Sequence, residues 1–284
     1  MFKVKHRSIL EILILAVVIR LTYIFFYPQI PVARDPKQYD DIALSVSQGK
    51  GFPVAMIGSE HKGVTRPPGY PLFLSFVYSI FGHSYQAVRI FQALIDTLTC
   101  LVIFYLGGAI FNFSIGHIAA LGYAFYFPVI IYTGVLYTET VFSLLLAIAM
   151  LFLLVAIKYD RFIHWMFSGL FLGATTLISS RSEFVPFFIL IALLLNKYSL
   201  KNSFIKIGVI VLFMLLVISP WTIRNYLVTG KFILIENYNQ DGRGLWLATN
   251  PYGAMTWSDP EVKELVKDMP INERVIFFQR EARE

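Results

Sequence analysis

Long apolar stretches alternate with short polar segments along most of the chain. Seven of them cover residues 9–27, 85–111, 115–132, 135–157, 165–179, 184–195 and 204–221. A helix needs about twenty such residues to cross a bilayer, where lipid offers no hydrogen-bond partners to an open backbone. The pattern therefore predicts an all-α polytopic membrane protein.

An eighth apolar stretch, residues 69–82, follows Pro67-Pro68 and is too short to cross a bilayer. We interpret it as a juxtamembrane or re-entrant helix. If it does not cross, the basic loops 158–164 and 196–202 lie on the same side as the basic N-terminus, as the positive-inside rule requires. If it crossed, these loops would lie outside, so the non-crossing topology is favoured.

The first apolar stretch is preceded by Lys3, Lys5, His6 and Arg7, and no small-residue cleavage site follows it. It is typical of an uncleaved signal-anchor whose N-terminus stays in the cytoplasm. We therefore expect a multi-pass protein of the cell membrane. The short stretches 165–179 and 184–195 are expected to form a helical hairpin with Arg181 at its outer tip.

Composition agrees with a membrane protein. Hydrophobic residues make up 57% of the 284 and charged residues only 15%, whereas a soluble domain has about a quarter charged. The single cysteine, Cys100, excludes a disulfide within one chain and is expected to pack in the interior. The net charge of +6 is scattered among loops, which favours membrane topology and anionic headgroups over nucleic acid as its explanation.

Two regions are expected: a membrane bundle over residues 1–224, with an outer loop at 28–67, and a polar extracytoplasmic segment over 225–284. Within the polar segment, residues 232–236 predict a short strand, and residues 259–269 and 270–284 predict helices. The charged helical pattern at the end has no stop signal, so we expect the C-terminal region to be incomplete.

In the outer loop, apolar residues recur at helical spacing over residues 37–48, which predicts an amphipathic helix lying on the membrane. Asp35 would be its N-cap and Pro36 its first residue. Asp35 could stabilise the helix by about 1 kcal/mol as a cap, or act as a catalytic base at the membrane boundary, and the two roles are compatible. Asp40 and Asp41 are interpreted as solvated helix charges.

Other polar clusters fall at the same end of the predicted helices. Arg66 could snorkel to headgroups or hold a phosphate, which suits guanidinium geometry. Glu139 could complement a helix dipole, but an acid beside the membrane favours a functional role. If Arg181 and Arg224 converge with Arg66 in one cavity, the three would suit a phosphate-linked lipid.

Motifs for other chemistries are weak or missing. Glu60-His61 could contribute to a metal site, although a pair in a surface loop is the simpler interpretation. The sequence contains no Gly-rich phosphate loop, Rossmann fingerprint, zinc motif or serine-hydrolase elbow.

Taken in order, the polar clusters resemble those of the membrane glycosyltransferases with the GT-C fold, and most closely glycosyltransferase family 39. That family includes protein O-mannosyltransferases and lipid A aminoarabinose transferases. The residues that carry the resemblance are Asp35 with Tyr39, Arg66-Pro67-Pro68-Gly69-Tyr70-Pro71, Thr138-Glu139, Ser180-Arg181, Pro220-Trp221-Thr222-Ile223-Arg224-Asn225, and Gly244-Leu245-Trp246 with Asn250-Pro251. The resemblance covers essentially the whole chain and implies a GT-C-like helical bundle with juxtamembrane helices in its first outer loop.

The resemblance also implies roles for single residues. Asp35 would be the acid close to the reacting centre, Glu139 the second functional acid, and Arg66 the contact to the donor lipid phosphate. The remaining residues expected at the substrate site are Tyr39, Tyr70, Arg181 and Arg224. Thr65 stands where the lipid A enzyme has a glutamate, so the resemblance does not support a metal site built on that position. It assigns no cofactor and leaves a divalent metal open.

The function hypothesis is inverting transfer of a sugar from a polyprenyl-phosphate donor to a lipid, glycan or protein acceptor at the extracytoplasmic face, with Asp35 as the base. A transporter or flippase of lipid-linked sugars is the alternative, although transporters place their charges at the bilayer midplane, often in repeated halves. A third hypothesis is a structural subunit, which would need neither Asp35 nor Glu139.

Overall fold

The computed structural model describes residues 6–27, 32, 35–53, 66–196 and 198–236, with single positions at 264, 267, 269, 277 and 280. Within these residues all regular elements are helices, which confirms the all-α prediction. They are α1 (His6–Phe26), α2 (Asp35–Ser47), α3 (Gly69–Phe81), α4 (Tyr85–Ile110), α5 (Phe113–Phe125), α6 (Phe127–Thr133), α7 (Glu139–Tyr159), α8 (Phe162–Ile178), the 3₁₀ turn η1 (Ser180–Ser182), α9 (Val185–Leu195) and α10 (Leu200–Thr229).

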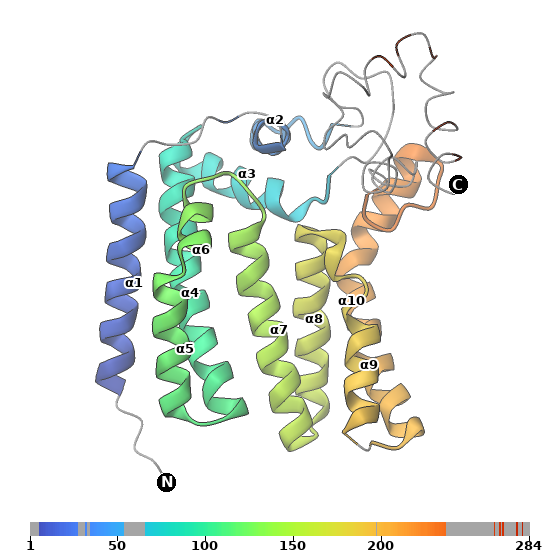
Figure 1. Cartoon of the computed structure of the whole chain (residues 1–284). Helices are drawn as coiled ribbons and strands as arrows, with labels where there is room; N and C mark the ends of the chain where they lie inside the picture. The colour runs from blue at the N-terminus through green and yellow to red at the C-terminus, as the bar shows by residue number, and fades with distance from the viewer. Residues whose placement is uncertain are drawn as a thin grey trace.

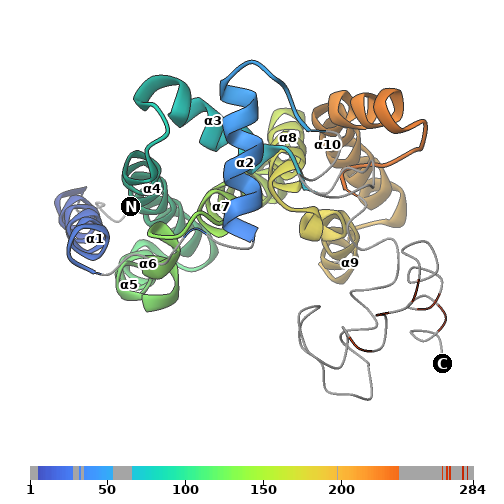
Figure 2. The ribbon, with the colours of Figure 1, turned by 90° about the horizontal axis from the view of Figure 1, so that it is seen from above.

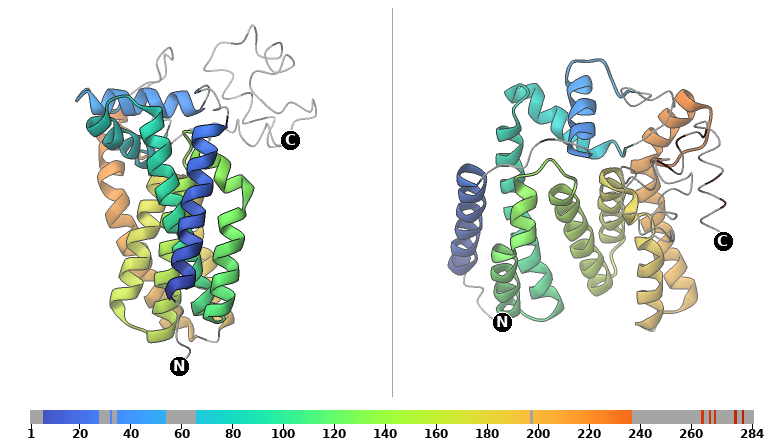
Figure 3. Two further views of the ribbon diagram at one scale, coloured as in Figure 1. Left: turned by 90° about the vertical axis from the view of Figure 1, so that its left-hand side faces the viewer. Right: turned by 45° about the horizontal axis from the view of Figure 1, so that its top comes forward.

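Most helices run side by side along one axis, while α2 and α3 lie across one end of this bundle (Figure 1, Figure 3). We call this the α2–α3 end. Among the described helices, α1, α4, α7 and α10 are each long and apolar enough to cross a membrane, and α5 with α6 would make a fifth span. The protein is therefore a multi-pass membrane protein.

The short apolar stretch forms α3, which packs against α2 and does not run through the bundle (Figure 1). The α4–α5, α7–α8 and α9–α10 connections lie at the other end, with the start of α1. This is the chain path of the non-crossing topology. Seen from above, α2 crosses the middle of the α2–α3 end with α3 beside it (Figure 2).

The predicted helix over residues 115–132 is broken rather than straight. Helices α5 and α6 meet at Tyr126, which has an extended backbone, and their axes differ by 56°. The cause is Pro128, two residues later, because proline lacks an N–H and its ring clashes with the preceding helical turn.

Close packing of α8 on α10 depends on two glycines one helical turn apart. A methyl group on Gly169 would lie 2.4 Å from the carbonyl oxygen of Ile210, and one on Gly173 would lie 2.7 Å from that of Met214. Small residues at this spacing let the backbones of membrane helices approach closely.

A buried ion pair that the sequence analysis did not identify joins α1 to α4. The Nε atom of Arg20 lies 2.5 Å from Oδ2 of Asp96, and the two side chains are 0% and 1% exposed. The hydroxyl of Tyr123 on α5 donates to the other carboxylate oxygen at 2.6 Å. Three helices are thus held together by one ionic group.

Residues 231–236 form no strand, so that prediction was wrong. After Gly230 ends α10 in the left-handed conformation, the segment folds back along the helix. Side chains of α10 donate hydrogen bonds to the backbone carbonyls that a strand would offer to a neighbouring strand. Trp221 Nε1 donates to the carbonyl oxygen of Ile235 at 2.8 Å, and Asn225 Nδ2 donates to that of Ile233 at 3.1 Å.

Several expectations lie outside the described residues and stay predictions. They are the features at Arg34, Glu60-His61, Thr65, Gly244-Leu245-Trp246 and Asn250-Pro251, and, apart from single positions, the helices at 259–269 and 270–284. The proposed division near residue 224 also stays a prediction, and α10 continues past it to Thr229.

Candidate functional site

Asp35 and Arg66 form an ion pair at the α2–α3 end. Asp35 is the first residue of α2, and Arg66 lies three residues before α3. The Nη2 atom of Arg66 lies 2.5 Å from Oδ1 of Asp35, and its Nε donates to Gln38 Oε1 at 2.9 Å. The carboxylate side chain is 42% exposed and the arginine only 9%. The acid is therefore accessible, whereas the cation is sheltered beside it.

Two predicted substrate-binding tyrosines form a layer beneath this pair. The guanidinium of Arg66 lies 5.1 Å from the ring centroid of Tyr39, which meets Tyr70 edge-on at 5.2 Å. Burial raises the pKa of Tyr39 to about 12, so its phenol is neutral. Tyr70 is fully buried, and its hydroxyl donates to Gln92 at 2.7 Å. The structure thus gives Tyr70 a supporting position rather than an exposed one.

Gly69 fixes the segment that carries Arg66 against the end of α8. A methyl group on Gly69 would lie 2.7 Å from Cδ1 of Ile178 and 2.8 Å from the carbonyl oxygen of Leu177. No side chain fits there without moving backbone. The start of α3 therefore sits directly on the helix end that leads into η1 and Arg181.

Glu139 and Arg181 form a second ion pair at the same end. Glu139 begins α7, and Nη2 of Arg181 lies 3.3 Å from its Oε1. The guanidinium also donates through Nε to Ser179 Oγ at 2.9 Å and lies 5.3 Å from the centroid of the Phe142 ring. Both side chains of the pair are solvent-accessible.

Asp35, Arg66 and Glu139 act on the same neighbour, Tyr137, in the connection between α6 and α7. Burial and then the carboxylates of Asp35 and Glu139 raise the pKa of this phenol, while Arg66 opposes the shift. One tyrosine that responds to all three charges indicates that residues far apart in the sequence gather in one region.

Arg224 has a different set of partners. Its Nη2 donates to the carbonyl of Phe52 at 3.1 Å, and its guanidinium lies 4.7 Å from the centroid of the Trp221 ring. The ring of Phe52 meets Trp221 edge-on at 4.8 Å. Arg224 therefore holds the segment after α2 onto α10, and its described contacts do not include the partners of Arg66 or Arg181.

Glu236 lies close to the second ion pair, although the sequence pattern did not predict it there. The folded-back segment after α10 brings it to η1, where Ser180 Oγ donates to its Oε1 at 2.6 Å. Burial raises the pKa of its carboxyl group, and Ser180, Arg66 and Arg181 act against that shift. Nothing near Glu236 in the sequence indicates this position, because it depends on the bonds between residues 233–235 and α10.

Asp40 is not the solvated charge that we expected. Its side chain is 0% exposed, and its carboxylate accepts hydrogen bonds from Tyr78, His83 and Tyr85 at 2.7–2.8 Å. The buried face of α2 includes Asp40 together with its apolar neighbours at helical spacing. Asp41, on the next position around the helix, is 32% exposed and pairs with Lys37 at 2.6 Å, as expected for a surface charge.

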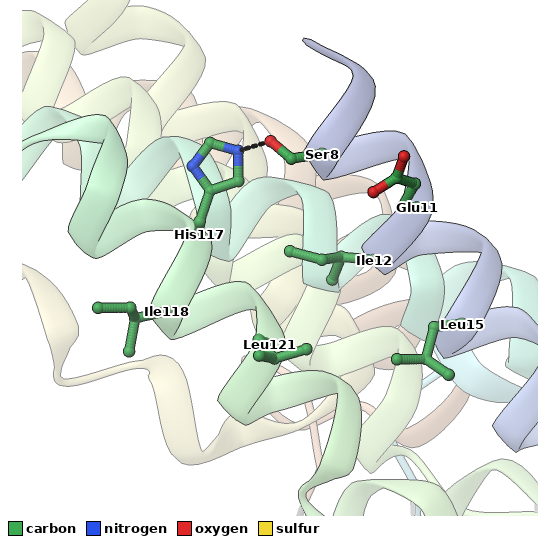
Figure 4. Close-up of a pocket in the computed structure, with 7 residues that line it drawn as sticks. All are labelled: Ser8, Glu11, Ile12, Leu15, His117, Ile118 and Leu121. Carbon is green, nitrogen blue, oxygen red and sulfur yellow. Dashed lines mark hydrogen bonds between the residues drawn. The ribbon is translucent and has the colours of Figure 1, made fainter. Parts of the chain in front are cut away.

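Among the described residues, the groove that the structure shows lies away from the two ion pairs. No group of three or more His, Cys, Asp or Glu side chains placed to hold a metal occurs in the described part of the chain. A groove of about 380 Å³ lies between α1 and α5 (Figure 4), at the opposite end from Asp35. It is lined by Ser8, Glu11, Ile12, Leu15, His117, Ile118 and Leu121, with Ser8 and His117 hydrogen-bonded at 2.7 Å.

Comparison with known proteins gives one match. The family model described as dolichyl-phosphate-mannose-protein mannosyltransferase matches residues 65–223, more than half of the chain. The matched range contains Arg66, Tyr70, Glu139 and Arg181 and leaves out Asp35. No curated protein and no solved structure matches the chain.

Proposed function

Because the chain belongs to the dolichyl-phosphate-mannose-protein mannosyltransferase family, and so to the membrane glycosyltransferases of the GT-C type, we propose that it moves one sugar from a polyprenyl-phosphate donor to an envelope acceptor. The acceptor would be a lipid, a glycan or a protein. The observation that carries the proposal is the accessible Asp35 paired with the sheltered Arg66.

The arginines would hold the donor phosphate. A guanidinium presents a planar fork of donors that matches phosphate oxygens, and Arg66 already uses two of its nitrogens on Asp35 and Gln38. Arg181 is the second candidate, because it is accessible and shares Glu236 as a neighbour with Arg66. Contact of Arg224 with the donor stays a prediction, as does contact of Tyr39 and Tyr70 with substrate.

Donor binding would also prepare the base. When the phosphate takes the guanidinium of Arg66, the carboxylate of Asp35 loses its partner and can accept a proton. Asp35 takes that proton from the acceptor hydroxyl as the oxygen attacks the anomeric carbon from the face opposite the phosphate. The bond between the anomeric carbon and the phosphate oxygen breaks, and the polyprenyl phosphate leaves with the electron pair. The configuration at the anomeric carbon of the transferred sugar is inverted. Arg66 and Arg181 stabilise the charge that develops on the phosphate, and Glu139 orients the acceptor.

The charge distribution supports an extracytoplasmic active face in the cell membrane. Three basic residues lie at the end opposite α2 and α3: Lys158 in the last turn of α7, Arg161 between α7 and α8, and Lys201 in the first turn of α10. Basic connections stay in the cytoplasm, which would place Asp35 outside, with the donor lipid tail among the helices.

A transporter of lipid-linked sugars remains the second hypothesis. Transporters place charged residues along a substrate path near the bilayer midplane. A charged pair inside this bundle, Arg20 with Asp96, is sealed from solvent and forms further hydrogen bonds with Tyr123, Ala16 and Ala124. Such a pair supports helix assembly better than transport.

The test is mass spectrometry of envelope glycans, lipids and proteins from cells that carry the natural chain, no chain, Asp35→Asn or Asp41→Asn. We expect one sugar modification to disappear without the chain and with Asp35→Asn, and to return with Asp41→Asn, at equal protein amounts in the membrane. A normal modification with Asp35→Asn would overturn the assignment of the base. Unchanged glycans with altered movement of lipid-linked sugar across vesicles would support the transporter.

A further inference from the structure

The buried carboxylate of Asp40 connects α2 to the corner formed by α3 and α4. Its Oδ1 accepts from Tyr78 on α3 at 2.8 Å and from His83, in the turn between the helices, at 2.7 Å. Its Oδ2 accepts from Tyr85, the first residue of α4, at 2.7 Å. One side chain of α2 therefore accepts hydrogen bonds from both helices of the corner and from the turn that joins them.

The donors are themselves ordered around the carboxylate. The imidazole of His83 meets the rings of Tyr78 and Tyr85 edge-on, with centroids 4.9 and 5.0 Å away. Lys37, on α2 itself, lies farther away at 3.4 Å and is exposed, so it adds little. Burial alone would raise the pKa of Asp40, but the bonds from His83, Tyr85 and Tyr78 outweigh it and lower the pKa, so the group is an anion. Tyr78 is buried, and a buried donor that loses its acceptor is costly, which makes its contact with Asp40 hard to replace.

The position of Asp40 on α2 links its hydrogen bonds to the ion pair of Asp35 and Arg66. Tyr39, the adjacent residue, faces Arg66, and Asp35 lies five residues earlier, about 7.5 Å along a rigid helix. Through Tyr39 the helix also packs on Tyr70. We propose that Asp40 is a positioning residue that anchors α2 to the α3–α4 corner and thereby sets where Asp35 stands relative to Arg66. The effect on sugar transfer rests on the function proposed above, whereas the anchoring itself does not.

The anchoring can be tested without any substrate. Ala43 is fully buried on the docked face of α2, and the natural chain has one cysteine, Cys100, which is buried. In an Ala43→Cys chain in vesicles, a membrane-impermeant maleimide reports on undocking of α2. We expect Asp40→Asn to speed labelling of this cysteine on the order of tenfold, because undocking becomes easier.

Asp41→Asn is the matched control, since it makes the same change one residue away on the exposed face. It should label at the parent rate. If the introduced cysteine were labelled equally slowly in Asp40→Asn and Asp41→Asn, the inference would be overturned. If the Asp40→Asn chain is not recovered from membranes, Tyr85→Phe removes one donor and keeps the carboxylate. The labelling rate should then rise by a smaller factor, and a rate equal to that of the parent chain would count against anchoring by Asp40.

A sugar-transfer assay distinguishes a positioning role of Asp40 from a general loss of folded protein. With polyprenyl-phosphate mannose as the donor probe, we expect Asp40→Asn to lower kcat about tenfold in the natural background and less than about threefold in Asp35→Glu, because the two residues act as one unit. An equal loss in both backgrounds would mean that Asp40 does not act through Asp35. If no variant transfers sugar, the proposed function fails, and the labelling result still decides the anchor.

Discussion

Arg66 supports Asp35 from the protected side of their ion pair: one Nη2–Oδ1 contact of 2.5 Å joins an arginine that is almost buried to a carboxylate that is open to solvent. The arrangement is suited to exchange of partners, because an incoming phosphate can replace the carboxylate on the guanidinium and free the acid.

Arg66→Lys keeps the charge but loses the planar fork. We expect KM for a polyprenyl-phosphate donor to rise roughly tenfold to a hundredfold, in line with the loss of a hydrogen bond to a charged group. Initial rates over a range of donor concentrations measure this. Arg161→Lys, at the opposite end of the bundle, serves as the control. A lysine variant with natural KM would remove Arg66 from the phosphate site.

Glu139→Gln should lower sugar transfer and leave α7 folded. The variant loses the ion pair with Arg181, which is exposed and contributes little to stability. The melting temperature should therefore change little, while kcat with a saturating donor falls at least about tenfold if Glu139 orients the acceptor or the base. A fall in melting temperature that matches the loss of activity would point to a structural role instead.

Glu236→Gln should alter the pH dependence of stability. Because burial raises the pKa of Glu236 in the folded protein, the folded state binds this proton more tightly than the unfolded chain does. Its stabilising effect is present at acid pH and is lost as the pH rises through the raised pKa. The melting temperature of Glu236→Gln relative to the natural chain should therefore increase as the pH rises from about 4 to 7.

The matched control for that prediction is Glu264→Gln, whose carboxylate is exposed. This replacement should change the melting temperature little, because an exposed ion pair contributes little to stability. If Glu236→Gln showed the opposite slope, the carboxyl group would be stabilised as an anion, and its place between Ser180 and the two arginines would need another explanation.

Asp96→Asn should weaken the bundle strongly. Removal of one partner from a buried ion pair costs about 3–5 kcal/mol, because the other charge is left uncompensated. Thermal or denaturant unfolding in detergent measures the loss. Replacement of both partners, Arg20→Met with Asp96→Leu, should recover most of it, and a double variant as unstable as Asp96→Asn would argue that the pair has another role.

The sequence predicted those features that depend on local pattern. Apolar length predicted the four described helices that are each long enough to cross a membrane, α1, α4, α7 and α10. The short stretch at residues 69–82 predicted α3, and helical spacing after Asp35 predicted α2. Features that depend on contacts between distant segments were missed. Asp40 was misjudged because its donors lie 38–45 residues away, and Glu236 because its position comes from a segment folded back on α10. The apolar pattern also did not predict the Arg20–Asp96 pair, because a single charged residue in a long apolar stretch does not indicate which residue it pairs with.

That pair has a consequence for biosynthesis. Arg20 is made 76 residues before Asp96, so α1 enters the membrane while its counter-ion is still in the ribosome. An arginine at a helix centre raises the free energy of insertion by about 2.5–3.5 kcal/mol on translocon scales. The newly made α1 should therefore linger at the translocon, with its guanidinium in a wet environment, until α4 arrives. Co-translational pulling-force measurements should detect its release into lipid only after α4 has emerged.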